Sequence, residues 1–317
     1  MKYTQLSEEE RHRIAALKVE GKSLSAIARR LGRAPSTVSR EVKRNRYPTD
    51  GHYRAYHAVR MSRGRRKRAR SGSSFGAAAW KRVEELLKLD WSPEQVSGYL
   101  RKEGITVMSH ETIYQHLLRD RRKGGCLWER LRGARKKRRK RYGAYDSRGR
   151  LSGKRSIHER PMEAERREKI GHWEIDTVHG KGLESVLTLV DRRSGFVQIG
   201  LLNQRTAWET NWRLEKLMAR HPGCYATITS DNGSEFHSYR EVEAQSEVRF
   251  YFATPHHSWE RGTNENTNGL IRQYLPKGMS FAKLTQQACD AIARKLNSRP
   301  RKRHGYRTPN EIFNEGL

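Results

Sequence analysis

The fold is decided at residues 172–178, which read His172-Trp173-Glu174-Ile175-Asp176-Thr177-Val178. Successive side chains of a strand point to opposite faces of a sheet, and this stretch is typical of a strand. Further strands are expected at residues 186–190, 196–201, 226–230 and 249–252. Helices separate the later strands, so the order three strands, helix, strand, helix, strand, helix predicts a mixed α/β sheet.

Two of these helices carry informative side chains. The helix expected at residues 207–220 offers four side chains for burial, namely Trp208, Trp212, Leu214 and Leu217. The last helix, residues 262–275, has two faces when its residues are placed at about 100° intervals. The apolar face holds Thr267, Leu270, Ile271, Tyr274 and Leu275, and the other holds Arg261, Glu265, Asn268 and Arg272. An acid beside two arginines and an asparagine suits a metal ligand next to DNA phosphates better than a solvated surface.

The composition indicates a polyanionic partner. Of 317 residues, 66 are Lys or Arg and 35 are Asp or Glu, which gives a net charge of +31. Nucleic acid is the first partner to expect for such a chain, and a ribosome or a membrane surface is an alternative. No long apolar segment or signal-peptide run is present, so we expect no membrane contact and a cytoplasmic, nucleoid-associated protein. The scattered Cys126, Cys224 and Cys289 suggest neither a disulfide framework nor a zinc site.

The N-terminal segment predicts a helix-turn-helix. Three short helices are expected: the first follows a capping box at Ser7, the second stops at Gly32, and the third begins near Pro35. The third helix exposes a polar and basic face, made of Ser36, Ser39, Arg40, Lys43 and Arg44. This face is what docking in a DNA groove requires, although a plain three-helix bundle with a charged surface shares the pattern.

Changes of composition divide the chain into six parts. The expected parts are a helix-turn-helix domain (1–50), a basic linker (51–75), a second helix-turn-helix-like domain (76–120), another basic linker (121–165), an α/β core (166–280) and a helical, basic tail (281–317). The second linker contains an unbroken positive run at residues 135–141, which suits both a solvated connector and a phosphate clamp.

Linked motifs in the α/β region resemble a known family. They are Gly171–Asp176, Ser230–Phe236, Trp259–Asn266 and Asn268–Gly278, with Gly32–Glu41 near the N-terminus. Asp176, Asp231 and Glu265, the last two separated by 33 residues, resemble the acidic triad of DDE transposases and retroviral integrases. The similarity is closest to the bacterial insertion-sequence family numbered thirty, and it spans nearly the whole chain. Pro255-His256 departs from the family pattern, which has an aromatic residue after the proline.

The resemblance implies a ribonuclease-H-like core, preceded by two helix-turn-helix units, that cleaves and joins DNA strands. Asp176, Asp231 and Glu265 are then the catalytic and metal-binding residues, with Asp176 bridging two Mg²⁺ ions, for which Mn²⁺ can substitute. Water attacks first and a 3′-hydroxyl second. The residues expected to contact phosphates near the scissile bond are Arg261, Asn268, Arg272 and Lys277. The partners are the double-stranded DNA of transposon ends and target, bound by a homodimer or a higher homo-oligomer.

Other polar residues in these motifs have competing interpretations. Glu174 shares a strand face with Asp176, so it either lies beside the metals or is an ordinary paired acid. Glu235 and Glu260 are decoys that could be mistaken for the third acid. Glu260 is rejected because integrase-like cores place that acid three residues after the glycine, here Gly262, which selects Glu265. His172 is interpreted as a packing or hydrogen-bonding residue, since Mg²⁺ prefers oxygen ligands.

Two alternative functions remain open from the sequence. One is a sequence-specific repressor that has kept a catalytically silent core, and the intact triad argues against it. The other is a structure-specific nuclease that cleaves without strand transfer. The sequence does not define the terminal repeats, the target preference, the order of cleavages or the oligomer size.

Overall fold

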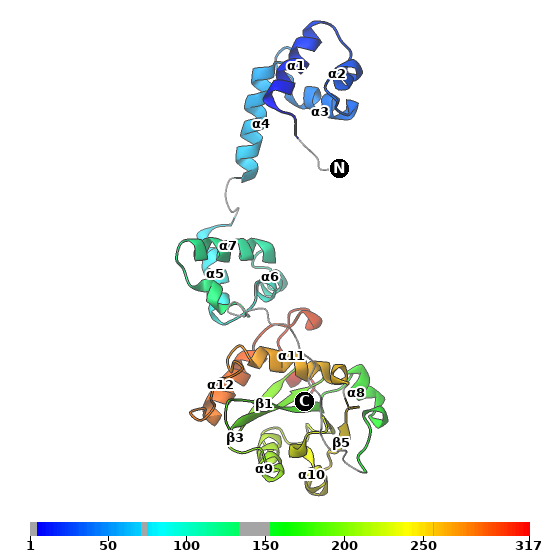
Figure 1. Cartoon of the computed structure of the whole chain (residues 1–317), viewed down its shortest axis with the longest axis vertical. Coiled ribbons are helices and arrows are strands. Elements are labelled where there is room, and N and C mark those ends of the chain that lie inside the picture. The colour runs from blue at the N-terminus through cyan, green and yellow to red at the C-terminus, as the bar shows by residue number, and fades with distance from the viewer. Residues whose placement is uncertain (1–4, 71–74, 133–152, 256) are drawn as a thin grey trace. The chain divides into compact units, whose positions relative to one another are not determined.

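The computed structural model describes residues 5–70, 75–132, 153–255 and 257–317 (Figure 1). The chain divides into two compact units, Met1–Gly76 and Ala77–Leu317. The basic run at 135–141 and His256 lie outside the described residues. No helix in the described parts of the chain combines the length and apolar character needed to cross a membrane.

The first unit is a four-helix module. Its helices are α1 (Glu8–Val19), α2 (Leu24–Arg30), α3 (Pro35–Asn45) and α4 (Ala55–Arg70). The capping box of Ser7 and Glu10 begins α1, and Pro35 occupies the first turn of α3, as predicted. Ile14, Ile27 and Val38 are fully buried between the first three helices. An ion pair of 2.7 Å between Arg11 and Glu41, both nearly buried, ties α1 to α3.

The first expected linker is wrong, because residues 55–70 of the segment 51–75 form α4. The apolar residues within this basic stretch explain the helix. Tyr53 and Ala58 belong to the same buried cluster as Ile14, and α4 packs against α1. Composition alone marked the segment as solvated, since its few apolar side chains become informative only when their packing partners are known.

The second unit begins with a helical module. It contains α5 (Ala77–Lys88), α6 (Pro93–Lys102) and α7 (His110–Arg122), followed by a 3₁₀ turn at Leu127–Arg130. Ser92 with Gln95 forms a capping box that begins α6, and Ser109 caps α7. Ile113 is buried, whereas Tyr114 is 38% exposed.

The second expected linker, 121–165, is also structured at both of its ends. α7 continues to Arg122, and the chain joins the sheet before residue 166. The backbone N–H of Phe252 donates to the carbonyl of Arg155 at 2.9 Å, so this strand edge is satisfied by the preceding segment. A 3₁₀ turn (Ile157–Glu159) and α8 (Met162–Arg166) follow. The α/β core therefore begins about a dozen residues earlier than the change of composition indicated.

A five-stranded mixed sheet forms the centre of this unit. Its strands are β1 (His172–His179), β2 (Ser185–Asp191), β3 (Val197–Leu202), β4 (Thr227–Ser230) and β5 (Arg249–Phe252). The order is β3-β2-β1-β4-β5, in which β1, β2 and β3 pair antiparallel and β4 and β5 are parallel to β1. The predicted mixed sheet is confirmed, and with helices on both faces it is a ribonuclease-H-like fold.

Helices cover the sheet on two sides (Figure 1). One face carries α9 (Ala207–Met218), α10 (Tyr239–Gln245) and the short α13 (Pro309–Asn314), and the other carries α11 (Gly262–Ile271) and α12 (Gln286–Asn297). The segment 281–317, expected as a tail, thus completes both layers of the core. Phe313 stacks on Phe196 with ring centroids 4.3 Å apart and is fully buried.

The expected burial of Trp208 and Trp212 is wrong. Their side chains are 71% and 40% exposed, and α9 buries Leu214 and Leu217 instead. The two leucines are three residues apart on the face against β3, whereas the tryptophans lie well around the helix from it. Hydrophobic character alone did not identify the buried face.

Replacing Phe313 tests whether the C-terminal helix is part of the core. Phe313→Ala should lower the free energy of unfolding by about 3–5 kcal/mol, because it removes a fully buried ring from a packed cluster. Urea unfolding followed by circular dichroism measures the change. Leu183→Ala, at a side chain that is 72% exposed, is the control and should change stability little. Equal effects of both variants would show that α13 is only loosely attached.

Candidate active site

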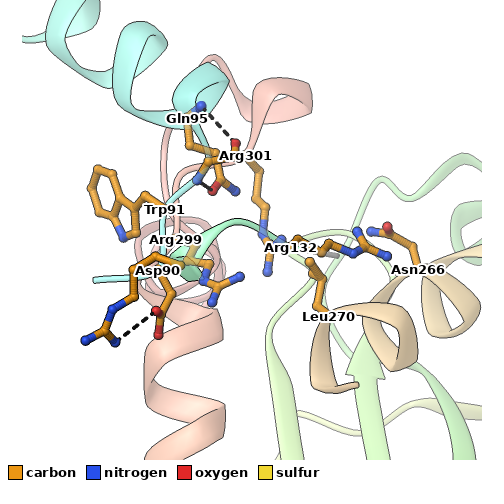
Figure 2. Close-up of a pocket in the computed structure, with 10 residues that line it drawn as sticks. Asp90, Trp91, Gln95, Arg132, Asn266, Leu270, Arg299 and Arg301 are labelled. Carbon is orange, nitrogen blue, oxygen red and sulfur yellow. Dashed lines mark hydrogen bonds and ion pairs between the residues drawn. The ribbon is translucent and has the colours of Figure 1, made fainter. Parts of the chain in front are cut away.

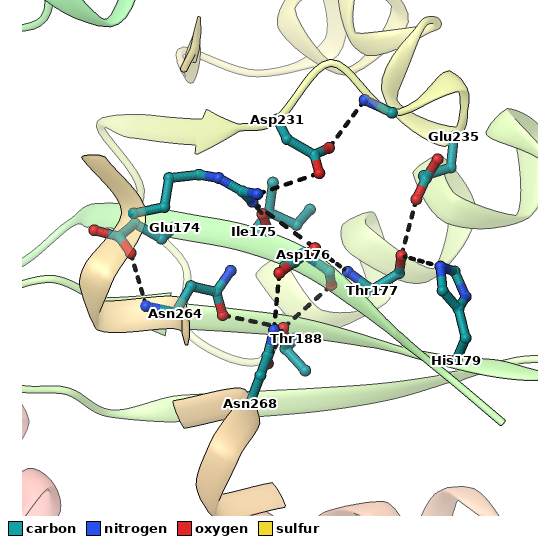
Figure 3. Close-up of polar contacts among 12 residues, drawn as sticks. Glu174, Ile175, Asp176, Thr177, His179, Thr188, Asp231, Glu235, Asn264 and Asn268 are labelled. Carbon is teal, nitrogen blue, oxygen red and sulfur yellow. Dashed lines mark hydrogen bonds and ion pairs between the residues drawn. The ribbon is translucent and has the colours of Figure 1, made fainter. Parts of the chain in front are cut away.

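Two acidic residues meet at the centre of the sheet because of the strand register. β1 and β4 are parallel neighbours, with Glu174 opposite Thr229. Two residues further along, the same register brings Asp176 of β1 level with Asp231, which directly follows β4. The structure therefore brings together two of the acids predicted from widely separated parts of the sequence (Figure 3).

Arg261 is the shared cationic partner of these two acids. One of its guanidinium nitrogens, Nη2, donates to Oδ2 of Asp231 at 3.2 Å, and Nη1 lies 3.8 Å from Oδ1 of Asp176. Nη1 also donates to the carbonyl of Ile175 at 3.1 Å, which fixes the guanidinium over β1. In this structure the guanidinium neutralises the carboxylates, and its expected contact with phosphate stays a prediction.

Two hydrogen bonds orient the carboxylate of Asp176, which also lies near Arg261. Oδ1 accepts from the backbone N–H of Thr177 at 2.8 Å, and Oδ2 accepts from Nδ2 of Asn268 at 2.8 Å. Burial raises the pKa of Asp176 to about 6; Arg261 opposes this shift, and the negative charge of Asp231 adds to it. A cation at this position stabilises the ionised form of both acids.

Glu265 is placed differently from the other two acids. Its side chain is exposed on α11 and makes no hydrogen bond or ion pair among the described residues. Within the same residues, no three His, Cys, Asp or Glu side chains lie close enough to hold a metal ion. Glu265 lies in the first turn of α11, four residues after Arg261, which directly precedes the helix. The structure therefore does not join the third predicted acid to the other two.

Buried amides hold α11 against the sheet (Figure 3). Asn264 is fully buried, and its backbone N–H donates to Oε2 of Glu174 at 2.8 Å. The hydroxyl of Thr188 lies 3.2 Å from the side-chain oxygens of both Asn264 and Asn268. The amide of Asn268 positions Asp176, and its expected contact with DNA stays a prediction.

Glu174 is a paired structural acid, which decides between its two interpretations. It is fully buried and forms an ion pair with Arg192, whose side chain is also buried. Arg192 donates in addition to the carbonyl of Ala164 at 2.9 Å. His172 is likewise a hydrogen-bonding residue, since its Nδ1 lies 2.9 Å from the hydroxyl of Thr227.

Sequence reasoning missed a polar group on the other side of the acids. Glu235, which was set aside as a decoy, accepts from the hydroxyl of Thr177 at 2.8 Å, and that hydroxyl lies 3.4 Å from Nε2 of His179 (Figure 3). The charge of Glu235 also contributes to the raised pKa of Asp176. The available signal was its position four residues after Asp231, in a 3₁₀ turn that folds back toward the strand ends.

The remaining expected DNA contacts lie at the surface or support the backbone. Arg272 donates to the carbonyls of His179 at 2.9 Å and Leu275 at 3.3 Å, whereas Lys277 is exposed. His257 stacks on Trp259 with centroids 4.3 Å apart. In the first unit, α3 exposes all five residues of its expected DNA-binding face, Ser36, Ser39, Arg40, Lys43 and Arg44.

A ribonuclease-H-like sheet with paired carboxylates at the centre, joined to a basic helical module, defines the class of DDE strand-transfer enzymes. The family model for a helix-turn-helix domain matches residues 2–45, and the model for an integrase core domain matches residues 166–258. The first match covers the helices that carry the α3 surface, and the second covers most of the α/β core.

Curated relatives identify the family within this class. The transposase for insertion sequence element IS4351 of Bacteroides fragilis is 42% identical over 315 residues, which cover 98% of this chain and 95% of that protein. The transposase for IS1086 of Cupriavidus metallidurans is 39% identical over 331 residues, covering 100% and 96%. Transposase InsI for IS30A of Escherichia coli is 37% identical, covering 93% and 79%. The chain belongs to the IS30 family of DDE transposases, enzymes that bind DNA and use divalent metal.

The buried pair of Glu174 and Arg192 leads to a stability prediction. Glu174→Gln leaves the Arg192 guanidinium buried without its closest counter-ion, so the free energy of unfolding should fall by about 3–5 kcal/mol. Urea unfolding measures this, with the exposed Glu247→Gln as the control. A loss below about 1 kcal/mol would mean that Glu174 does not anchor the core.

Proposed function

We propose that Asp176, Asp231 and Glu265 form the catalytic triad of this transposase and hold two Mg²⁺ ions, which Mn²⁺ can replace. The observation that carries the proposal is the register that places Asp176 and Asp231 side by side with one cation between them. Glu265 lies in the first turn of α11, and Arg261, which supplies this cation, directly precedes that helix. A change of its side-chain rotamer would turn the third carboxylate toward the pair.

The residues present fit a divalent cation. Carboxylate oxygens are hard ligands of the kind that Mg²⁺ prefers. The guanidinium of Arg261 already occupies the space between the two acids, which shows that a positive charge is accommodated there. When bound, divalent ions polarise the scissile phosphate and stabilise the charge on the attacking and leaving oxygens.

The chain's own residues orient the reaction. Asn268 and the Thr177 N–H fix the Asp176 carboxylate, and Arg261 would be available to contact phosphate if divalent metal were held by the acids. Water attacks phosphorus and the P–O3′ bond breaks, leaving a 3′-hydroxyl and a 5′-phosphate. That hydroxyl then attacks a second phosphodiester, and one 3′-oxygen is exchanged for another. No protein nucleophile takes part.

DNA recognition is assigned to the helical modules. The exposed face of α3 would read the terminal inverted repeats, and the α5–α7 module would act as a second helix-turn-helix. In the core, Arg272 and Lys277 would contact flanking phosphates with Arg261 and Asn268. Because two transposon ends must be brought together, the active species would be a homodimer or a larger homo-oligomer.

Removing any of the three acids tests the active-site assignment. Asp176→Asn, Asp231→Asn and Glu265→Gln should each reduce Mg²⁺-dependent nicking and joining of labelled end DNA by at least about 100-fold, because each removes a metal ligand. DNA binding should persist, and the exposed Glu247→Gln should remain active. Normal nicking by Asp231→Asn would reject the assignment. A silent-core repressor predicts no cleavage by the wild type, and a simple nuclease predicts nicks without joined products.

Charge removal on α3 tests the recognition surface. Arg40→Ala and Arg44→Ala should each weaken binding to end DNA, and each lost phosphate contact should lower the slope of log affinity against log salt by about 1. Fluorescence anisotropy over a salt series measures both quantities. Arg13→Ala, at an exposed α1 arginine paired with Glu9, provides the matched control. An identical loss in the control would assign the effect to net charge rather than to α3.

A further inference from the structure

A cationic cavity of about 220 Å³ lies where the α5–α7 module meets the back of α11 (Figure 2). Arg132 reaches it from the end of the module, and Arg299 and Arg301 reach it from the segment after α12. Asn266 and Leu270 of α11 form its floor. The cavity is thus built by three parts of the chain within the second unit.

The positive charges of this cavity are not balanced by acids. Asp90 is the only carboxylate among its lining residues, and it is already engaged by Arg130 at 3.5 Å and Lys295 at 3.4 Å. It also accepts from the hydroxyl of Tyr274 at 3.1 Å. Counting the parts of the chain that the structure describes, neither Arg132, Arg299 nor Arg301 has a carboxylate within ion-pair distance.

Burial makes this imbalance costly. Arg299 is only 2% exposed, and its Nε has no hydrogen-bond partner among the described atoms, although Nη1 donates to Gln273 at 3.2 Å. Burial, with the neighbouring charges of Arg299, Arg303 and Arg132, lowers the pKa of Arg301 to about 10. Arg301 therefore stays charged at neutral pH in a strongly positive surrounding. A bound anion would relieve the repulsion among these arginines.

The cationic surface continues along the same side of α11. An adjoining cavity of about 290 Å³ shares Asn266 and Arg301 and is lined in addition by Arg167, Lys302 and Arg303. Lys302 already pairs with Glu94 at 2.7 Å, but the remaining cations exceed what a single small anion would use, whereas a polyanion can pass from one cavity to the next. The arrangement therefore favours successive phosphates of one strand over an isolated ion.

We infer that this cavity binds a backbone phosphate of the DNA substrate, on the side of α11 opposite the acids. The inference rests on the proposed function, since it assumes that DNA reaches the catalytic face. Asn264 and Asn268 face the sheet, where Asn268 donates to Asp176, and Asn266 lies about 160° away around the helix.

Charge-removing variants of the cavity test the inference without any catalysis. Full-length Arg132→Gln, Arg301→Gln and the double variant are compared with wild type in binding a long random-sequence duplex in EDTA over a salt series. The double variant should lower the salt slope by about 1 and weaken binding about 10-fold near physiological salt. Arg249→Gln, an exposed arginine at the far end of β5 from Asp231, is the control and should match wild type. An unchanged slope and affinity in the double variant overturns the inference.

Two further measurements keep the outcome decisive. Arg132 is exposed and makes no hydrogen bond among the described residues, so Arg132→Gln alone decides the question if Arg301→Gln unfolds. Thermal unfolding with inorganic phosphate at constant ionic strength separates a free-anion site from a DNA site. Stabilisation by phosphate that the double variant loses, with normal DNA binding, would mean a free-anion site and overturn the inference. If the wild-type protein did not cleave DNA but the double variant still had a reduced salt slope, the triad would be rejected and this site would stand.

Discussion

The active site depends on one buried charge pair. Glu174 joins Arg192 at the β2–β3 turn and, through its other oxygen, accepts the backbone N–H of Asn264 in α11. A single carboxylate thus connects the central strand, the hairpin beside it and the helix that covers them. Because a buried ion must be matched on all sides, this contact fixes the height of α11 over β1. Asn268 in this helix and Arg261, which directly precedes it, reach Asp176 only from that position.

Much of the core could be predicted from sequence because its signals are local. Strand alternation, cap residues and turn glycines act within a few residues, and β1 to β5 and α11 appear close to where they were expected. The misses required knowledge of distant partners. Residues 55–70 were expected to be solvated, but Tyr53 and Ala58 pack in one cluster with Ile14. Trp208 was expected to be buried, but α9 packs its leucines against β3 and leaves Trp208 exposed. Tertiary packing overrides composition in both cases.

The site shows the same division between local and distant information. The pairing of Asp176 with Asp231 was predictable, because motif spacing and strand order place them on neighbouring strands. The group that lies between the two acids could not be predicted, since the position of Arg261 depends on the depth of α11, which Glu174 sets. The same limit applies to Glu235 and to Arg299, whose importance comes from what surrounds them rather than from their local sequence.

The guanidinium between the two acids has a consequence for the life of the chain. Two adjacent carboxylates in a partly buried site repel each other, and many such sites are poorly ordered until an ion arrives. Here the polypeptide provides its own counter-ion, so a newly synthesised chain can complete its sheet whatever the local supply of divalent metal. Divalent metal is then needed for turnover rather than for completing the fold.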